Sequence, residues 1–197
     1  MNVVIRHTKD LLSHSFDKEV EIQLELAENL WQTKLDDNHL EQVILNLCVN
    51  ACDAMTESSG GIIKITTANL IQEDDSECVR IGIMDNGIGM NEDVSSRIFE
   101  PFFTTKEQGK GTGLGLAMSY GIIEQHGGSM ECRSDYDVGS EFVITLPRSA
   151  ETLVVKEKPK PTINIMVPTA SGTSYLSTIR LLSGPSAKSF SSTMATT

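Results

Sequence analysis

Three short polar side chains recur along one predicted helix. Asn46, Asn50 and Asp53 stand at positions i, i+4 and i+7 within residues 38–55, so they share one stripe beside an apolar one. Asn and Asp are poor helix formers, and a solvated face would keep more helix propensity with Glu, Lys or Arg. The pattern therefore favours a functional stripe over a merely solvated one.

A carboxylate stands at the end of a predicted strand and is followed by glycines. Asp85 closes the strand 78–85, and Gly87 and Gly89 follow it in a DxGxG sequence. An ordinary tight turn explains this sequence as well as a functional role does. In the functional interpretation, the carboxylate lies beside backbone that has no side chains in the way of a flat ligand.

A glycine-rich segment opens a second predicted helix. GKGTGLGL (109–116) begins with glycine at every second position, which leaves the loop amides and the helix N-terminus free to face phosphate. Alone, such a loop is a weak indicator. Upstream, FEPFFTTK (99–106) places Thr104, Thr105 and Lys106 beside an aromatic cluster. This segment is either a flap with a cationic tip or a loop that its Phe residues anchor to the core.

The hydrophobic periodicity predicts the elements that must position these residues. It indicates helices over 3–13, 38–55 and 114–126, one helical turn around 94–99, and strands over 19–26, 62–70, 78–85, 129–135 and 140–147. Two pairs of strands follow one another without a helix between them, so antiparallel hairpins are expected. The predicted fold is an α/β (α+β) two-layer sandwich, with a mixed sheet of about five strands and helices on one face.

The composition excludes several classes of function. The chain has 197 residues, with 16 basic and 27 acidic side chains and a net charge of -11, which disfavours binding to nucleic acid or anionic membranes. The four cysteines have neither CxxC nor metal-ligand spacing, so a reducing compartment such as the cytoplasm fits. No window approaches the roughly 18 apolar residues of a membrane span, and no direct span is predicted.

The charge divides the chain near Pro147. Residues 1–150 hold 11 basic and 25 acidic side chains, whereas residues 151–197 hold 5 and 2. From residue 162 onward, Ser and Thr fill 15 of 36 positions. This composition predicts a disordered tail over 149–197, in which TINIMV (162–167) is the one strand candidate.

Taken in order, four motifs resemble the ATP-binding domain of sensor histidine kinases in the GHKL superfamily, which DNA gyrase, Hsp90 and MutL share. NLCVNACDAM is similar to the N box, DNGIGM to the G1 box, FEPFFTTK to the F box and GKGTGLGL to the G2 box. The resemblance covers residues 18–148 and implies a Bergerat-type fold. GGSMECRSDYDVGSEFVITLP resembles the nitrogen-regulator type of kinase.

The resemblance implies ATP and Mg²⁺ as cofactors and assigns roles to the motif residues. Asn46 and Asn50 would bind Mg²⁺ and, with Lys106, form the catalytic set, while Asp85 would accept a hydrogen bond from the adenine amino group. Lys106 would also reach the phosphates. The other implied nucleotide-binding residues are Asp53, Gly87, Gly89, Thr104, Thr105, Gly109, Gly111, Thr112, Gly113, Leu114, Gly115, Leu116 and Ser140. Ala54 departs from the family, in which many members have a Tyr at this position.

One residue bears on the reaction. Hydrolytic members of the superfamily resemble one another in having a Glu one helical turn before the magnesium-binding Asn, where it activates water. This chain has Asn46 at that position, and an amide cannot accept a proton. An attacking imidazole, with an unperturbed pKa of about 6.5, is already largely neutral at pH 7. The resemblance therefore implies a protein-histidine kinase, an enzyme that phosphorylates histidine.

The phosphoacceptor is expected to lie elsewhere. In the family, the phosphorylated His lies on a dimerisation hairpin before the ATP-binding domain, and neither His7 nor His14 matches its signature. Residues 1–17 resemble only the end of the second hairpin helix and a linker. The expected partners are a His-containing dimerisation domain, in a missing upstream segment or another chain, and a downstream response regulator. Alone, the chain is expected to be inactive in autophosphorylation. A cytoplasmic location is expected. A membrane-anchored parent protein is compatible with this location.

Three alternatives stay open. The first is a nucleotide-binding regulatory module without phosphotransfer. The second is a GHKL ATPase or a serine kinase of the anti-sigma type, to which Asn46 is contrary. The third is a truncated gene product, suggested by the missing hairpin and the unusual tail.

Overall fold

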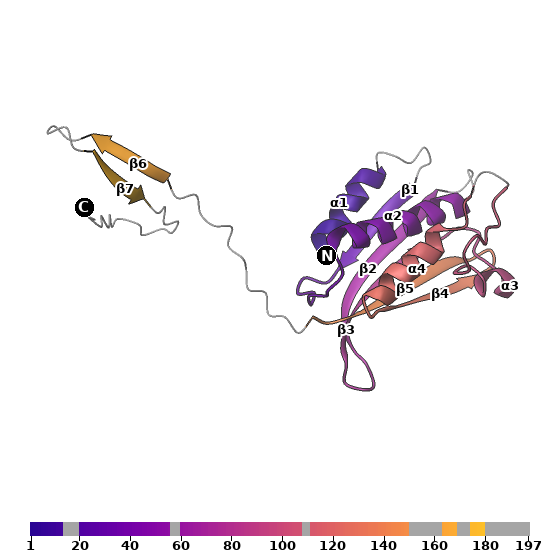
Figure 1. Cartoon of the computed structure of the whole chain (residues 1–197). Helices are drawn as coiled ribbons and strands as arrows, with labels where there is room; N and C mark the ends of the chain where they lie inside the picture. Colours follow the sequence, from indigo (N-terminus) through magenta and orange to yellow (C-terminus); the bar gives the residue numbers. More distant parts are fainter. Residues whose placement is uncertain (14–19, 56–59, 108–110, 150–162, 169–173, 180–197) are drawn as a thin grey trace. The chain divides into compact units, whose positions relative to one another are not determined.

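Five strands form one mixed sheet in the order β1-β2-β3-β5-β4 (Figure 1). They are β1 (Val20–Leu26), β2 (Gly61–Ile71), β3 (Glu77–Asp85), β4 (Ser129–Asp135) and β5 (Gly139–Pro147). β1 pairs with β2 in parallel, and the other neighbours are antiparallel. The predicted strands, both hairpins and the mixed sheet are thus confirmed.

The computed structural model describes residues 1–13, 20–55, 60–107, 111–149, 163–168 and 174–179. The chain divides into two compact units, Met1–Ala150 and Glu151–Thr197. In the second unit, β6 (Ile163–Pro168) pairs antiparallel with β7 (Ser174–Ile179). β6 overlaps the strand candidate at 162–167, whereas β7 lies in the part of the chain whose composition predicts disorder. Three of the six residues of β7 are Ser or Thr, and the other three are Tyr, Leu and Ile, of which Tyr and Ile favour strands.

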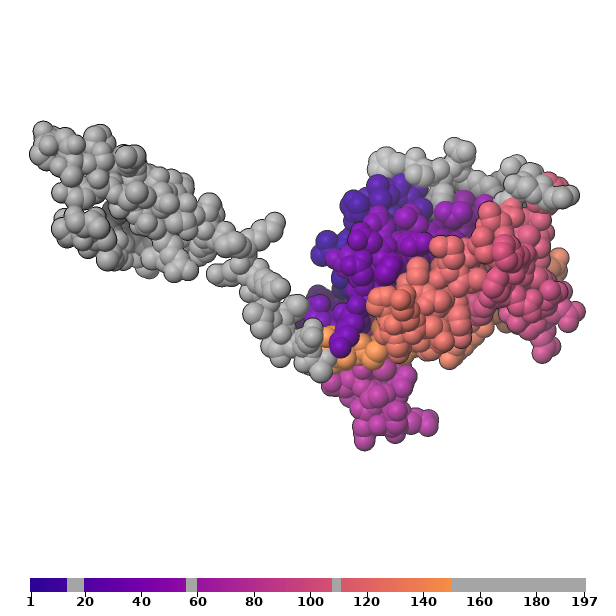
Figure 2. All heavy atoms as spheres, in the orientation of Figure 1, coloured from indigo at the N-terminus to yellow at the C-terminus, as the bar shows by residue number. Residues whose placement is uncertain are grey.

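Three helices cover one face of the five-stranded sheet (Figure 1). They are α1 (Asn2–Ser13), α2 (Asp37–Ala54) and α4 (Gly115–Gln125), and they confirm the three predicted helices. α2 begins where the carboxylate of Asp36 accepts a hydrogen bond from the Asn38 N–H at 2.8 Å. Figure 2 shows α2 and α4 side by side on this face, with the β2–β3 turn projecting beyond it.

The short helix α3 (Glu92–Ser95) begins earlier than the helical turn predicted around 94–99. The side chain of Asn91 accepts a hydrogen bond from the Val94 N–H at 2.9 Å and caps the helix there. The prediction followed the apolar residues Val94, Ile98 and Phe99, which pack toward the core but do not mark the cap.

In the described part of the chain, no helix combines the length and apolar character needed to cross a membrane.

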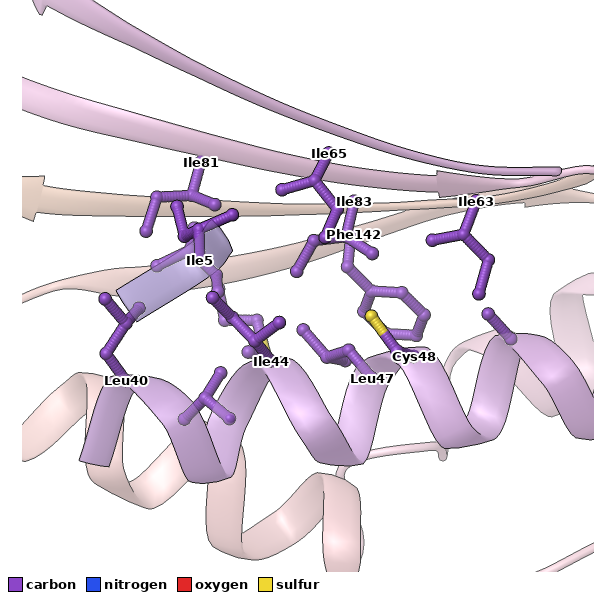
Figure 3. Packing of buried hydrophobic residues seen from close by; sticks show 14 of the residues in the cluster. Ile5, Leu40, Ile44, Leu47, Cys48, Ile63, Ile65, Ile81, Ile83 and Phe142 are labelled. Carbon is purple, nitrogen blue, oxygen red and sulfur yellow. The ribbon is translucent and has the colours of Figure 1, made fainter. Parts of the chain in front are cut away.

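The core lies between the helices and the sheet (Figure 3). Alternate residues of the central strands face α2 and pack against its apolar side chains, which recur at helical spacing. α1 adds Ile5 and Leu12 to the same cluster. The side chains seen packed together are Leu40, Ile44, Leu47, Cys48, Ile63, Ile65, Ile81, Ile83 and Phe142. This packing fixes how α2 is rotated about its axis.

Ile81→Ala tests this packing. Ile81 is fully buried on the central strand β3, so the variant is expected to lower the free energy of unfolding by about 2–5 kcal/mol. Urea unfolding followed by circular dichroism measures the loss. Val3→Ala on α1, where the side chain is 79% exposed, serves as the control and is expected to change stability by less than about 0.5 kcal/mol. Equal losses in the two variants would contradict the core described above.

Candidate functional site

A cavity of about 210 Å³ adjoins α2, the segment after β3, α3, the loop 103–106 and the start of α4. Its lining divides by chemistry into an apolar group and a polar group. The apolar side chains are Ala54, Ile88, Met90, Val94, Ile98, Phe103 and Leu116, and the polar ones are Asn50, Asp53, Thr104, Thr105 and Lys106. A cavity with mostly apolar walls and a few polar groups is typical of a small-molecule site.

The polar stripe of α2 meets a cation. The Lys106 ammonium lies 2.6 Å from Asp53 Oδ2 and donates a hydrogen bond to Asn50 Oδ1 at 3.3 Å. These three side chains, predicted from two separate motifs, are therefore brought together. Asn50 lines the cavity, and its carboxamide oxygen accepts a hydrogen bond from the positively charged Lys106.

Asn46, the first member of the stripe, contacts α4 instead. Its Nδ2 donates to Ser119 Oγ at 2.9 Å, and Ser119 is 2% exposed. A Cβ on Gly115 would collide with Asn46 Oδ1, so glycine is required where α4 begins beside α2. Asn46 is not among the residues that line the cavity. The structure thus places it at the joint between the two helices.

The turn after β3 lies against the C-terminal end of α2. Asp85 Oδ1 accepts a hydrogen bond from the Gly87 N–H at 2.9 Å, and the Ile88 N–H donates to the Ala54 carbonyl at 2.9 Å. A Cβ on Gly87 would lie 2.8 Å from that carbonyl oxygen, so only glycine permits this approach. Asp85 is 7% exposed and is not among the residues that line the cavity, although it contacts Gly87, which lies against Ala54 of the lining.

Burial dominates the electrostatics of Asp85. Desolvation raises the pKa of this carboxyl above its usual value, although the backbone N–H groups of Gly87 and Ser140 partly oppose the shift. Ser140 is Asp85's neighbour on β5, and its hydroxyl lies 3.0 Å from Ser134 Oγ. Burial, with the nearby Asp85 charge, also raises the pKa of Cys132 to about 12. Cys132 is therefore a neutral thiol at pH 7 and no nucleophile.

The FEPFFTTK segment is joined to the glycine-rich segment through the backbone. The Phe102 N–H donates to the Gly113 carbonyl at 2.9 Å. Gly113 has φ +65°, and a Cβ there would collide with the Phe102 backbone, so conformation and space both require glycine. Phe99 and Phe103 pack on the core, whereas Phe102 is 74% exposed with φ +68°. Two of the three Phe residues thus anchor this loop to the core, and the third is exposed.

The start of α4 completes the site. Leu114, the N-cap residue of α4, makes no side-chain cap hydrogen bond among the described residues, and its own N–H donates to Thr112 Oγ1 at 3.4 Å. Leu116 lines the cavity, as do Gly89, Thr104 and Thr105. The predicted residues that lie outside its lining are Asn46, Asp85, Gly87, Gly111, Thr112, Gly113, Leu114, Gly115 and Ser140, and Gly109 lies outside the described residues.

Several residues of the site were not predicted. The apolar side chains Met90, Val94 and Ile98 line the cavity. Met90 ends the DNGIGM motif and the other two lie in the predicted helical turn, but none of them was predicted as a binding residue. Ser119 is the one serine of a largely apolar helix, and no sequence pattern distinguishes it from a solvated residue. Their roles depend on contacts between elements that are distant in the sequence.

The fold and the cavity define a two-layer α/β domain of the GHKL class. The model of the family "Histidine kinase-, DNA gyrase B-, and HSP90-like ATPase" matches residues 35–150. The chain belongs to this family.

Its relatives are histidine kinases. The chain is 43% identical over 158 residues to the sensor kinase CckA of Brucella abortus, a match that covers 75% of this chain and 16% of that protein. The solved catalytic domain of histidine kinase ThkA is 31% identical with a TM-score of 0.63, covering 75% of this chain and 92% of that one. ThkA in complex with the response regulator protein TrrA gives 28% identity and a TM-score of 0.60, over 76% of this chain and 40% of that one.

Asp85→Asn is expected to change how stability depends on pH. Because the folded state raises the pKa of Asp85, it keeps the proton to higher pH than the unfolded state does. The free energy of unfolding of the wild type therefore falls as pH rises above the usual pKa, and this contribution is absent in the variant. Urea unfolding between about pH 4 and pH 7 measures the difference between the two proteins.

Asp74→Asn is the control for this comparison. Asp74 lies in the exposed β2–β3 turn, where hydrogen bonds from Ser76 lower the pKa of its carboxyl. Its ionised form therefore favours the folded state, so the pH dependence removed by this substitution has the opposite sign. Two variants that shift the pH profile in the same direction would refute the assignment for Asp85.

Proposed function

We propose that this chain is the ATP-binding catalytic domain of a two-component histidine kinase, which transfers the γ-phosphoryl group of Mg-ATP to a histidine on another segment or chain. The observation that carries the proposal is the cavity itself. It combines apolar walls with an ammonium, that of Lys106, held at the Asn50 carboxamide. The first part suits a purine base and the second suits phosphates.

Each part of ATP has a matching part of the site. The apolar side chains would contact the adenine, and the buried carboxylate of Asp85 would accept a hydrogen bond from its amino group. Lys106 and the amides from Gly111 to Gly115 would hold the phosphates, where the N-terminal end of α4 favours negative charge. In a chain of net charge -11, these local groups must supply the attraction for a polyanion.

Asn50 fits a magnesium ion. The described residues contain no cluster of three or more His, Cys, Asp and Glu side chains that would hold a metal by itself. Asn50 offers a hard carboxamide oxygen that already accepts from a cation, which suits an ion whose other ligands are phosphate and water. Bound Mg²⁺ would neutralise phosphate charge during transfer. The contact of Asn46 with Ser119 gives less support to its proposed role as a second ligand.

Asn46 favours transfer over hydrolysis. It stands one helical turn before Asn50, where a general base for water would be needed, and its amide cannot accept a proton. Its nitrogen is also committed to Ser119. A neutral imidazole needs no strong base, so a histidine acceptor is the substrate that this site suits.

The remaining partners follow from this proposal. The acceptor would lie on a His-containing dimerisation domain, and the phosphoryl group would pass on to a response regulator, the kind of protein with which ThkA was solved. None of the four cysteines forms a disulfide in the structure, which supports a reducing compartment, and we propose the cytoplasm.

Asn50→Ala tests the nucleotide site. Loss of the carboxamide is expected to weaken Mg-ATP binding at least about tenfold, because the Mg²⁺ ion would lose the Asn50 oxygen as a ligand. The circular dichroism spectrum should stay unchanged. Calorimetric titration of the full chain measures the affinity. Asn38→Ala, at the exposed start of the same helix, is the matched control and should bind as the wild type does. Equal affinity in all three proteins would remove Asn50 from the site.

A phosphotransfer assay distinguishes the classes of function. The chain, radiolabelled ATP and the isolated dimerisation domain of CckA are expected to yield acid-labile, base-stable phosphate on that domain. Steady phosphate release without an acceptor would support an ATPase instead. ATP binding with neither outcome would favour a regulatory module.

A further inference from the structure

The Lys106 ammonium contacts two polar side chains of α2. Its ammonium contacts Asp53 Oδ2 at 2.6 Å and Asn50 Oδ1 at 3.3 Å, and the side chains of Lys106 and Asp53 are 35% and 49% exposed. The pair is therefore specific in geometry but open to solvent, so its interaction is modest and sensitive to salt.

The charge of Asp53 is unfavourable for the proposed ligand. A carboxylate beside a polyphosphate repels it unless a cation lies between them. Asp53 lines the same cavity as Asn50, and its described ion pair is with Lys106. A direct contact between Asp53 and phosphate would therefore oppose binding, which leaves the lysine as the group on which Asp53 acts.

Asn50 connects this pair to the proposed metal. The carboxamide oxygen that would bind Mg²⁺ is the one that accepts from Lys106. An ammonium and a metal ion at one oxygen repel each other, so Lys106 at Asn50 opposes a metal ion there. A metal ion bound at Asn50 would therefore favour release of Lys106.

The stem of Lys106 lies beside the glycine-rich segment. The Lys106 N–H donates to Thr104 Oγ1 at 3.2 Å, and a Cβ on Gly111 would lie 2.7 Å from that oxygen and 3.1 Å from Lys106 Cδ. The flexible stem of Lys106 therefore lies next to Gly111, in the segment that would hold the phosphates.

We propose that Asp53 is a positioning residue that holds the Lys106 ammonium at Asn50, from which Mg-ATP would displace it. Lys106 would serve both as the counter-cation of Asp53 and as a phosphate ligand. This inference rests on the proposed function and changes the role of Asp53 from nucleotide contact to holder of the lysine. It follows that Asp53 opposes nucleotide binding.

The sign of one measurement tests this role. In calorimetric titrations of the full chain with ATP in EDTA, Asp53→Asn is expected to bind about two- to fivefold more tightly than the wild type, because the lysine is released and a repelling charge is removed. The gain should shrink at high salt. Asp37→Asn makes the same charge change on the same helix roughly 24 Å away and should leave the affinity unchanged.

Amide hydrogen exchange supplies a second measurement that needs no nucleotide. Asp53→Asn and Lys106→Met both break the pair, so both should speed exchange over 103–107 in the free protein. Only Lys106→Met should weaken ATP binding. This opposition between two variants of one ion pair is not expected from a purely structural contact.

The outcomes separate this inference from the proposed function. A wild type that binds no ATP would overturn both. A wild type that binds ATP, with Asp53→Asn binding it equally or more weakly in EDTA, would overturn the role of Asp53 alone. Unchanged exchange over 103–107 in both variants would show that the pair does not hold the loop.

Discussion

The rotation of α2 about its own axis is the constraint on which the site depends. Leu40, Ile44 and Leu47 are buried to 1% exposure or less, and this stripe can reach the sheet in one orientation only (Figure 3). Since successive helical residues are about 100° apart, the same rotation turns Asn46 toward α4 and Asn50 toward the cavity. The hydrophobic core therefore aims the polar side chains, although it contributes no chemistry itself.

Close approach of backbones determines the shape of the cavity. Gly87 lets the turn after β3 meet the Ala54 carbonyl, and Gly115 lets α4 begin against Asn46. Hydrogen bonds from Ile88 to Ala54 and from Phe102 to Gly113 hold these approaches in place. At these two positions glycine removes a side chain where two segments must touch, whereas Gly113 is also required by its positive φ. The apolar walls of the cavity can then close around a flat ligand.

The electrostatics of the site are local and opposed to the charge of the whole chain. A net charge of -11 repels a polyanion, so the cationic Lys106 and the N-terminal end of α4 are the attractive groups near the cavity. Asp85 shows the contrary arrangement, since burial raises its pKa while two backbone N–H groups help to keep the carboxylate. The site thus combines a partly exposed cation with a buried anion. Each lies where a different part of a nucleotide would need it.

The sequence by itself determined the elements, the mixed sheet and four motifs, because periodicity and glycine spacing are local properties of the chain. It also indicated the stripe on α2 and the carboxylate at the end of β3. Only the tertiary structure decided that Asn46 contacts Ser119, that Lys106 pairs with Asp53, and that Asp85 is buried outside the cavity lining. It also decided the early start of α3, where Asn91 caps the helix. The physical reason is that such contacts join residues from different elements or depend on a single cap, and packing settles them after periodicity has fixed the elements.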